Sequence, residues 1–184
     1  MRRAKLGKNR GEPKKARIRY RGVCSTAIVN VGARSLRIAW TNSGIAFAGD
    51  AAEAPTDIVE HRLKMRLVER KPPALLRQAL VAAEKGSKMV DVPIDLSWAT
   101  EYEQLVLWAA LSIPWGETRP YSWLAREARR PLAVRAAASA IARNPLWLLI
   151  PCHRVIAANN KIGSYGPSGV KRKRELLARE GVVL

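Results

Sequence analysis

Apolar and polar positions follow two different periods along the first half of the chain. The segments 25–32, 35–40 and 44–50 are rich in β-branched and aromatic residues and are separated by glycine and asparagine. This pattern predicts three short strands in a hairpin or meander. The segments 56–70 and 73–86 instead place apolar residues at helical spacing, and the second ends in a glycine suited to a C-cap. We therefore expect two helices after the strands.

The second half is predicted to be mainly helical. The stretch 89–99 is extended and contains Pro93, so we place a boundary there and divide the chain into residues 1–95 and 96–184. A helix is predicted over 100–113, because a threonine and a glutamate at its start have capping-box spacing.

Two further helical segments, 121–128 and 132–143, flank a tight Arg-Arg-Pro break. They predict a helix-turn-helix, and a plain helical hairpin fits the sequence equally well. The second segment is mostly alanine and serine, and such small side chains let a helix approach another helix or DNA closely. Further on, 154–166 favours two short strands around an Asn-Asn turn, and 169–181 favours a final helix capped by Gly181.

The composition adds a charge argument to this outline. Hydrophobic residues make up 48% of the chain, which is typical of a globular protein. Lysine and arginine number 33 against 15 acidic residues, giving a formal net charge of +18. Ten of these cations lie in residues 2–21, a basic arm suited to non-specific phosphate contact. An arginine-rich surface would usually carry nearly as many carboxylates, so we favour nucleic acid as the partner.

Cysteine usage and hydropathy indicate where the protein works. Cys24 and Cys152 are far apart and form no disulfide framework, which favours a reducing interior. The N-terminus has no apolar core of a secretory signal, and the longest apolar stretch, 105–115, is too short to span a bilayer. We expect a soluble cytoplasmic protein with no membrane partner.

The candidate chemistry lies at Cys152 and His153, which are adjacent behind a proline. A free thiol has a pKa of about 8.5, and burial alone would raise it. A histidine that takes the proton reverses this, although neighbouring side chains seldom face each other, so a bridging water or a sharp turn is needed. A third group should orient the histidine, and the C-terminal acids Glu175 and Glu180 are the candidates.

Three other interpretations of the cysteine stay open at this point. A lone buried cysteine is often a small core residue. A zinc site from Cys24, His61, Cys152 and His153 lacks the short ligand spacing that zinc sites use. A cysteine hydrolase would need a more distant histidine, and His61 has no supporting context.

Several segments in order resemble the O6-alkylguanine-DNA alkyltransferases, DNA-repair proteins that move an alkyl group from a damaged guanine onto their own cysteine. The resemblance rests on IPWGETRPYSWLA, NPLWLLIPCHRVI, GSYG and KRKRELLAREG, and runs from about Tyr102 to Gly181. It implies an α+β fold of two lobes. The N-terminal lobe would be α/β and ribonuclease H-like, and the C-terminal lobe mainly helical with a winged helix-turn-helix.

The resemblance also implies roles for the reacting residues. Cys152 would be the alkyl acceptor, and His153 would act on it through a water. Glu180 would orient the histidine. Tyr121 would donate a hydrogen bond to the guanine ring as it leaves, although an ordinary half-buried aromatic before a helix N-cap at Ser122 is the plain alternative.

The base pocket and the DNA-binding surface follow from the same resemblance. The residues implied to bind the substrate are Trp147, Tyr165, Gly166, Ser168 and Lys173. The residues implied to contact DNA or to join the DNA-binding helix to the site are Arg135, Asn144, Ser122 and Ala136. Among these, Arg135 would be a finger that enters the base stack in place of a flipped nucleotide.

Two departures from the family pattern concern the pocket. Trp147 stands where the family commonly has a small residue or proline, so it is in question whether the pocket accepts bulky alkyl groups. The loop 164–173 is one residue longer than the usual pattern. Cys24 lacks partners for the zinc site that some members carry, so we expect neither a metal nor a cofactor.

We therefore expect a monomer that repairs double-stranded DNA containing alkylated guanine. The transfer would be irreversible and single-turnover, with base flipping from the minor groove and activity on O4-alkylthymine as an open possibility. A non-repairing relative is disfavoured because Cys152 is present. A basic helix-turn-helix regulator with a structural cysteine is the alternative from another class.

Overall fold

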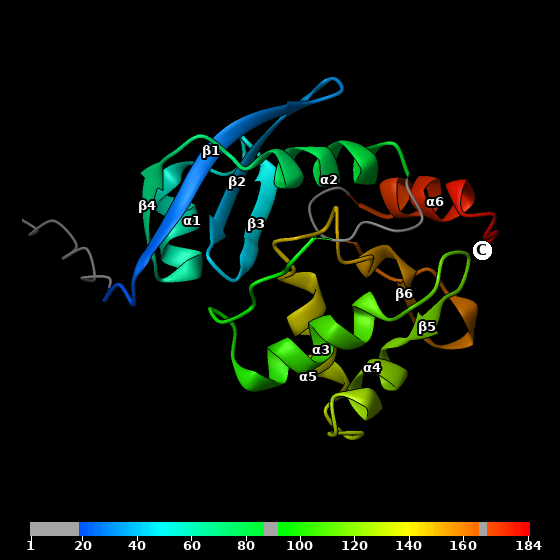
Figure 1. The fold of residues 1–184 in the computed structure, drawn as a ribbon. Helices are drawn as coiled ribbons and strands as arrows, with labels where there is room; N and C mark the ends of the chain where they lie inside the picture. Colours follow the sequence, from blue (N-terminus) through cyan, green and yellow to red (C-terminus); the bar gives the residue numbers. More distant parts are fainter. Residues whose placement is uncertain (1–18, 87–91, 166–168) are drawn as a thin grey trace, which may run out of the picture.

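The computed structural model describes residues 19–86, 92–165 and 169–184 (Figure 1). This part of the chain contains a four-stranded sheet, six α-helices and a small sheet of two short strands, which confirms the α+β fold class. Figure 1 shows the larger sheet with α1 and α2 at one end of the molecule and α3, α4 and α5 at the other. None of the helices in the described ranges has the length and apolar character needed to cross a membrane.

The three predicted strands of the first half are confirmed. They are β1 (Val23–Val31), β2 (Arg34–Thr41) and β3 (Gly44–Asp50), and they form an antiparallel meander. The strand order is β3-β2-β1-β4, with β4 (Arg66–Glu69) parallel to β1.

The helix predicted over 56–70 is wrong in its second half. Helix α1 (Thr56–Leu63) ends because Lys64 takes a left-handed conformation with φ of 54°, and the chain then enters β4. The open edge of β1 explains the difference, because its backbone groups need partners. Arg66 N–H donates to Gly22 O, and Arg70 N–H donates to Thr26 O. This pairing outweighs the local helical pattern.

Helices cover both faces of the sheet. Helix α2 (Ala74–Glu84) was predicted, and it buries Leu76, Ala79 and Leu80 against one face. Gly86 follows it in a left-handed conformation, as its predicted capping position requires. The other face packs against Val59 and Leu63 of α1.

The capping box at the start of α3 (Glu101–Leu111) is confirmed. The Thr100 hydroxyl accepts from Glu103 N–H, and the Glu103 carboxylate accepts from Thr100 N–H. Helices α4 (Tyr121–Glu127) and α5 (Val134–Ala142) pack against α3 and against each other.

Helix α4 begins at Tyr121, as the helical pattern over 121–128 predicts, and the plain alternative that made Ser122 its N-cap is wrong. Pro120 is the N-cap of α4, Tyr121 is the first helical residue, and Ser122 is exposed inside the helix. The reason lies in β5 (Arg119–Pro120), which pairs in parallel with β6 (Val155–Ile156) and keeps the chain extended up to Pro120.

The C-terminal part has less strand than predicted. Within the described residues 154–165, β6 is the one strand of the expected pair, because it pairs with β5 and not with the chain that follows. Asn159 and Asn160 turn the chain in left-handed conformations within the 3-10 helix η2 (Ala158–Asn160), as expected for an Asn-Asn turn. Helix α6 (Gly169–Arg179) then follows, with Gly181 past its end.

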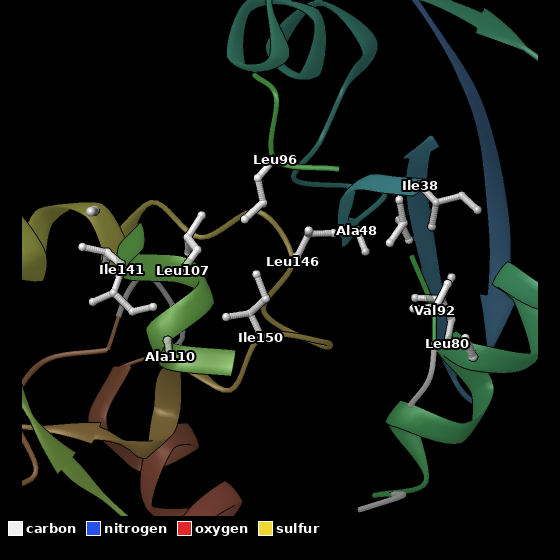
Figure 2. Packing of buried hydrophobic residues seen from close by; sticks show 14 of the residues in the cluster. Ile38, Ala48, Leu80, Val92, Leu96, Leu107, Ala110, Ile141, Leu146 and Ile150 are labelled. Atoms are coloured by element: carbon white, nitrogen blue, oxygen red, sulfur yellow. The ribbon is translucent and has the colours of Figure 1, made fainter. Parts of the chain in front are cut away.

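One core joins the two parts of the chain. Figure 2 shows Leu146 and Leu96 between residues of the sheet and α2, such as Ile38, and residues of α3 and α5, such as Leu107. The outer edge of β3 also holds the segment that leads to Cys152, because Ala48 N–H donates to Pro145 O at 3.0 Å. The sheet therefore positions the chain that carries the candidate site.

Helix α4 ends in a Schellman motif built without glycine. Arg129 N–H donates to Arg126 O, and Arg130 N–H donates to Ala125 O. Arg129 occupies the position that glycine usually takes, with φ of 60°. A non-glycine residue there costs on the order of 1 kcal/mol.

We predict that Arg129→Gly stabilises the protein. Relief of the left-handed strain should exceed the entropy that glycine adds to the unfolded chain, for a net gain of about 0.5 kcal/mol. Urea unfolding measures the change, with Arg126→Gly, inside α4, as the matched control that should destabilise. A loss of stability in Arg129→Gly would contradict the strain.

Candidate active site

A cavity of about 580 Å³ lies between β3 and the C-terminal part of the chain. Cys152, Tyr121 and Tyr165 line it together with α5 residues such as Ile141. The sheet side of the wall is formed by residues that the sequence did not single out: Arg34, Phe47, Ala48, Gly49, Asp50, Glu53, Ala54 and Arg62. The cavity is large enough for a purine base with its substituent.

Cys152 begins the 3-10 helix η1 (Cys152–Arg154), directly after Pro151. Its Sγ lies 3.7 Å from Tyr165 Oη. Burial raises the pKa of the Cys152 thiol, and hydrogen bonds with Tyr165 and Asn144 and the charge of Lys173 only partly oppose this. The resting group is therefore a thiol, and it needs a base to become a nucleophile.

Asn144 holds the loop that presents the cysteine. Its Nδ2 donates to Ile150 O at 3.0 Å, and its Oδ1 accepts from Leu146 N–H at 2.9 Å. The side chain is buried, so these bonds are protected from water. One amide thus closes the turn from the end of α5 to the residues just before Cys152.

His153 is oriented by Glu180 rather than by Glu175. Its Nε2 lies 2.7 Å from Glu180 Oε1, whereas Glu175 is exposed and pairs with Arg172. Position along the sequence does not choose between these two acids, the resemblance implies Glu180, and the structure places Glu180 at the histidine.

Three donors hold the Glu180 carboxylate in its ionised form. Arg154 contacts both of its oxygens, His153 donates to one of them, and Gly116 N–H donates to the other at 3.1 Å. Burial opposes ionisation, but the hydrogen bonds from His153, Arg154 and Gly116 outweigh it and lower the pKa of Glu180 to about 2. The carboxylate side chain is only 3% exposed.

Two glycines allow this contact. Gly181 has φ of 81° and ends α6 in a Schellman motif, with Gly181 N–H donating to Ala178 O and Val182 N–H donating to Leu177 O. Glu180 is therefore the last residue before the turn. Gly116 has φ of 78°, and a Cβ there would lie 3.3 Å from Glu180 O, so glycine allows the close approach.

The hydrogen bond to Glu180 also decides which nitrogen of His153 is free. An ionised carboxylate only accepts, so Nε2 must carry the proton. In the neutral imidazole, Nδ1 is then the lone-pair acceptor. It is buried, and no group in the described part of the chain hydrogen-bonds to it.

Tyr121 and Lys173 lie on opposite sides of the cavity wall. Tyr121 lines the cavity, and burial, followed by the neighbouring Cys152, raises its pKa. Lys173 is 0% exposed and lies behind the wall, with its Nζ donating to Val155 O at 2.5 Å and 5.9 Å from the Tyr121 ring centre. Burial lowers the pKa of Lys173 to about 8. Lys173 therefore supports Tyr121 and β6 instead of facing the cavity.

Of the remaining predicted pocket residues, two line the cavity and two lie outside the described part of the chain. Trp147 and Tyr165 line the cavity, and the guanidinium of Arg34 lies 5.4 Å from the Trp147 ring centre. Gly166 and Ser168 lie outside the described residues.

Three of the four residues predicted to contact DNA or to join the DNA-binding helix to the site lie on α4 and α5, whereas Asn144 is buried after α5. Arg135, Ala136 and Ser122 are exposed. Arg135 lies three and seven residues before Ala138 and Ala142, which line the cavity, so it shares their face of α5. The arginine therefore lies beside the cavity and not on the opposite side of the helix.

Sequence reasoning missed several contacts of the site. Arg154 follows His153 directly, and that adjacency was the available signal for its contact with Glu180. Arg34 and Gly116 carried no signal, because each is far along the chain from its partner.

The zinc alternative has no support among the residues that the structure describes. No group of three or more histidine, cysteine or acidic side chains gathers there. Cys24 is buried in β1 and donates to Trp40 O at 3.1 Å, with its pKa raised by burial to about 12. His61 is exposed on α1.

Comparison with known proteins identifies the relatives of this chain. The profile of the 6-O-methylguanine DNA methyltransferase DNA-binding domain matches residues 101–182. A methylated-DNA–protein-cysteine methyltransferase of Mycobacterium tuberculosis (strain ATCC 25618 / H37Rv) is 46% identical over 90 residues, which is 49% of this chain and 53% of the relative. A methylated-DNA–protein-cysteine methyltransferase of Methanothermobacter thermautotrophicus is 42% identical over 118 residues, which is 61% of this chain and 65% of the relative.

A solved structure extends the likeness over both parts of the chain. The crystal structure of M. tuberculosis OGT in complex with DNA matches with a TM-score of 0.65 and 31% identity, over 85% of this chain and 91% of that chain. The chain belongs to the O6-alkylguanine-DNA alkyltransferase family. In sequence it spans about half the length of the first of these relatives.

We predict that Glu180→Gln destabilises the protein at neutral pH and that the deficit shrinks in acid. Above the ordinary carboxyl pKa of 4.5 the ionised Glu180 contributes its full stabilisation, and this is lost as pH falls toward about 2. The removed charge leaves the largely buried Arg154 guanidinium, which is 11% exposed, without its carboxylate partner, at a cost on the order of 3 kcal/mol. Urea unfolding across this pH range measures the gap between the two proteins.

Glu175→Gln is the control for that experiment. Glu175 is an exposed acid on the same helix, and its pair with Arg172 should contribute less than about 1 kcal/mol. A Glu180→Gln deficit that stays constant with pH would contradict the low pKa of Glu180.

Proposed function

We propose that this protein repairs DNA by moving an alkyl group from O6-alkylguanine onto Cys152. The observation that carries the proposal is the position of Cys152, which lines a base-sized cavity next to a histidine held by an ionised carboxylate. The matching relatives are named methylated-DNA–protein-cysteine methyltransferases, which supports the same activity here.

The proton path starts at the thiol. His153 Nδ1 faces no protein donor in the described residues, and Cys152 is its neighbour in sequence, so a water can pass the thiol proton to Nδ1. Glu180 keeps the other nitrogen protonated and stabilises the imidazolium that forms. Lys173 adds a positive charge that favours the thiolate.

The transfer step needs no cofactor, because the bonds, the electron pair and the proton are all accounted for by the protein and the substrate. A bond forms between Cys152 Sγ and the alkyl carbon as the bond from that carbon to O6 breaks, and the electron pair leaves with the guanine. Tyr121 donates a hydrogen bond and then a proton to the departing ring, and the proton held by His153 restores the tyrosine through water. The product is a thioether that has no easy return, so each molecule reacts once.

Access to the alkyl carbon requires the base to leave the duplex. Extrusion costs a few kcal/mol, and a side chain that fills the gap in the stack offsets part of it. Arg135 is suited to this role because it is exposed beside the cavity on the same face of α5 as Ala138. Ser122 and Ala136, both exposed, would face the DNA backbone.

The wider assignment follows from charge and from the DNA-bound relative. We propose that α4 and α5 act as a helix-turn-helix on the minor groove, with β5 and β6 as its wing, and that binding is driven by phosphate contacts. The M. tuberculosis relative solved in complex with DNA supports this partner. We further propose that residues 1–95 comprise the basic arm and a ribonuclease H-like α/β lobe. Residues 96–184 would form the domain that binds DNA and carries the reaction, and one chain would act alone.

Trp147 sets the substrate range in this proposal. It narrows the cavity beside Cys152 and is held there by Arg34, which also pairs with Glu84 at 3.5 Å. Methyl groups should therefore transfer faster than bulky ones, on guanine first and on O4-alkylthymine as a weaker substrate.

We predict that mixing the protein with duplex DNA containing O6-methylguanine adds one methyl group per molecule, located on Cys152 by peptide mass spectrometry. Cys152→Ser should leave the lesion in place, because serine is a far poorer nucleophile at neutral pH. Cys24→Ser is the control and should react like the wild type. An unmodified wild type would point to a DNA-binding regulator, and repair by Cys152→Ser would exclude the proposed acceptor.

A further inference from the structure

The turn between α4 and α5 carries the most exposed large apolar side chain among the described residues. Leu132 is 98% exposed. A single exposed leucine on a protein surface is ordinary and needs no explanation. Leu132 differs because of how the turn is held and what surrounds it.

The turn is rigid on both sides of the leucine. The Schellman motif at the end of α4 fixes Arg129 and Arg130 before it, and Tyr102 of α3 donates its hydroxyl to Ala133 O at 3.2 Å after it. The guanidinium of Arg130 lies 5.2 Å from the Tyr102 ring centre. The leucine is therefore presented from a fixed backbone, which lowers the entropy lost when it docks.

The surroundings of Leu132 are strongly basic. Four arginines between residues 121 and 135 are exposed, and the only acid in that stretch is Glu127. They are Arg126, Arg129, Arg130 and Arg135. Charge complementarity commits this surface to a polyanion, and a second copy of the same chain would be repelled.

We propose that Leu132 is an apolar wedge that packs against the sugar edges of the minor groove beside the site that Arg135 enters. The inference rests on the proposed function, since it takes duplex DNA as the partner. Minor-groove proteins insert leucine and other apolar side chains where a bent or opened duplex offers apolar surface. Arginines at the turn contact phosphates, and the leucine gains free energy by leaving water.

The proposal can be tested by separating the apolar contribution to duplex affinity from the electrostatic contribution. Leu132→Gln removes the apolar contact with little change in size, so duplex affinity should fall about fivefold, as expected for partial burial of a leucine. The salt dependence of binding should keep its slope because no charge changes. Leu132→Met retains an apolar side chain of similar size and should bind within about twofold of the wild type.

The experiment is fluorescence anisotropy of labelled undamaged duplex with the full chain over a salt series. Arg129→Gln is the electrostatic comparison, and it should reduce the salt slope by about one ion. Val183→Gln is the matched control, because Val183 is also an exposed apolar residue, near the C-terminus, and should leave binding unchanged. Thermal unfolding of Leu132→Gln should match the wild type, since the side chain is exposed.

Three results would overturn the wedge. The first is that Leu132→Gln binds duplex DNA like the wild type. The second is that Leu132→Gln and Leu132→Met lose the same affinity. The third is that Leu132→Gln changes the sedimentation of the protein without DNA, which would assign the leucine to a contact between copies of the chain. Binding to undamaged duplex does not depend on transfer. If the wild type transfers no methyl group, the proposed function fails, and this result is independent of the binding test for Leu132.

Discussion

The site depends on one carboxylate that stays ionised in a buried position. Glu180 is at the end of α6, where the negative end of the helix dipole disfavours an anion, and it is stable there because Arg154, His153 and Gly116 all donate to it. This single group connects α6, the η1 turn and the loop before β5. Through Nε2 it also decides that the free nitrogen of His153 is Nδ1. The contacts that orient His153 are thus the same contacts that hold α6, the η1 turn and the loop before β5 together.

That constraint explains how a cysteine with a raised pKa can still be reactive. Burial keeps Cys152 as a thiol when the cavity is at rest, which protects it from oxidants that attack thiolates. In the proposed reaction, deprotonation is coupled to a base that is already oriented and to a substrate that fills the cavity. The sheet contributes by holding the segment before Cys152 through the bond from Ala48 to Pro145. Reactivity therefore belongs to the folded cavity and not to the Cys-His pair alone.

Signals that lie within a few residues were predicted well, and those that depend on distant contacts were not. The capping box of Thr100 and Glu103 and the capping glycine Gly181 are local, and the structure contains both. Strand β4 was missed because the edge of β1 overrides a helical pattern, and the pairing of β6 with β5 was missed because the two strands are far apart in the chain. At the site, Glu180 could be named as a candidate from the sequence. The roles of Arg34 and Gly116 could not, because neither is near its partner in the chain.

The most direct test of the account is the tautomer of His153. Nitrogen-15 NMR of the full-length protein in mildly alkaline buffer distinguishes a protonated ring nitrogen from an unprotonated one, with Glu180→Gln as the comparison. The account predicts that Nε2 carries the proton in the wild type and Nδ1 does not, and that this preference weakens when Glu180 is replaced. A proton on Nδ1 in the wild type would contradict it, because His153 could not then accept the proton of Cys152.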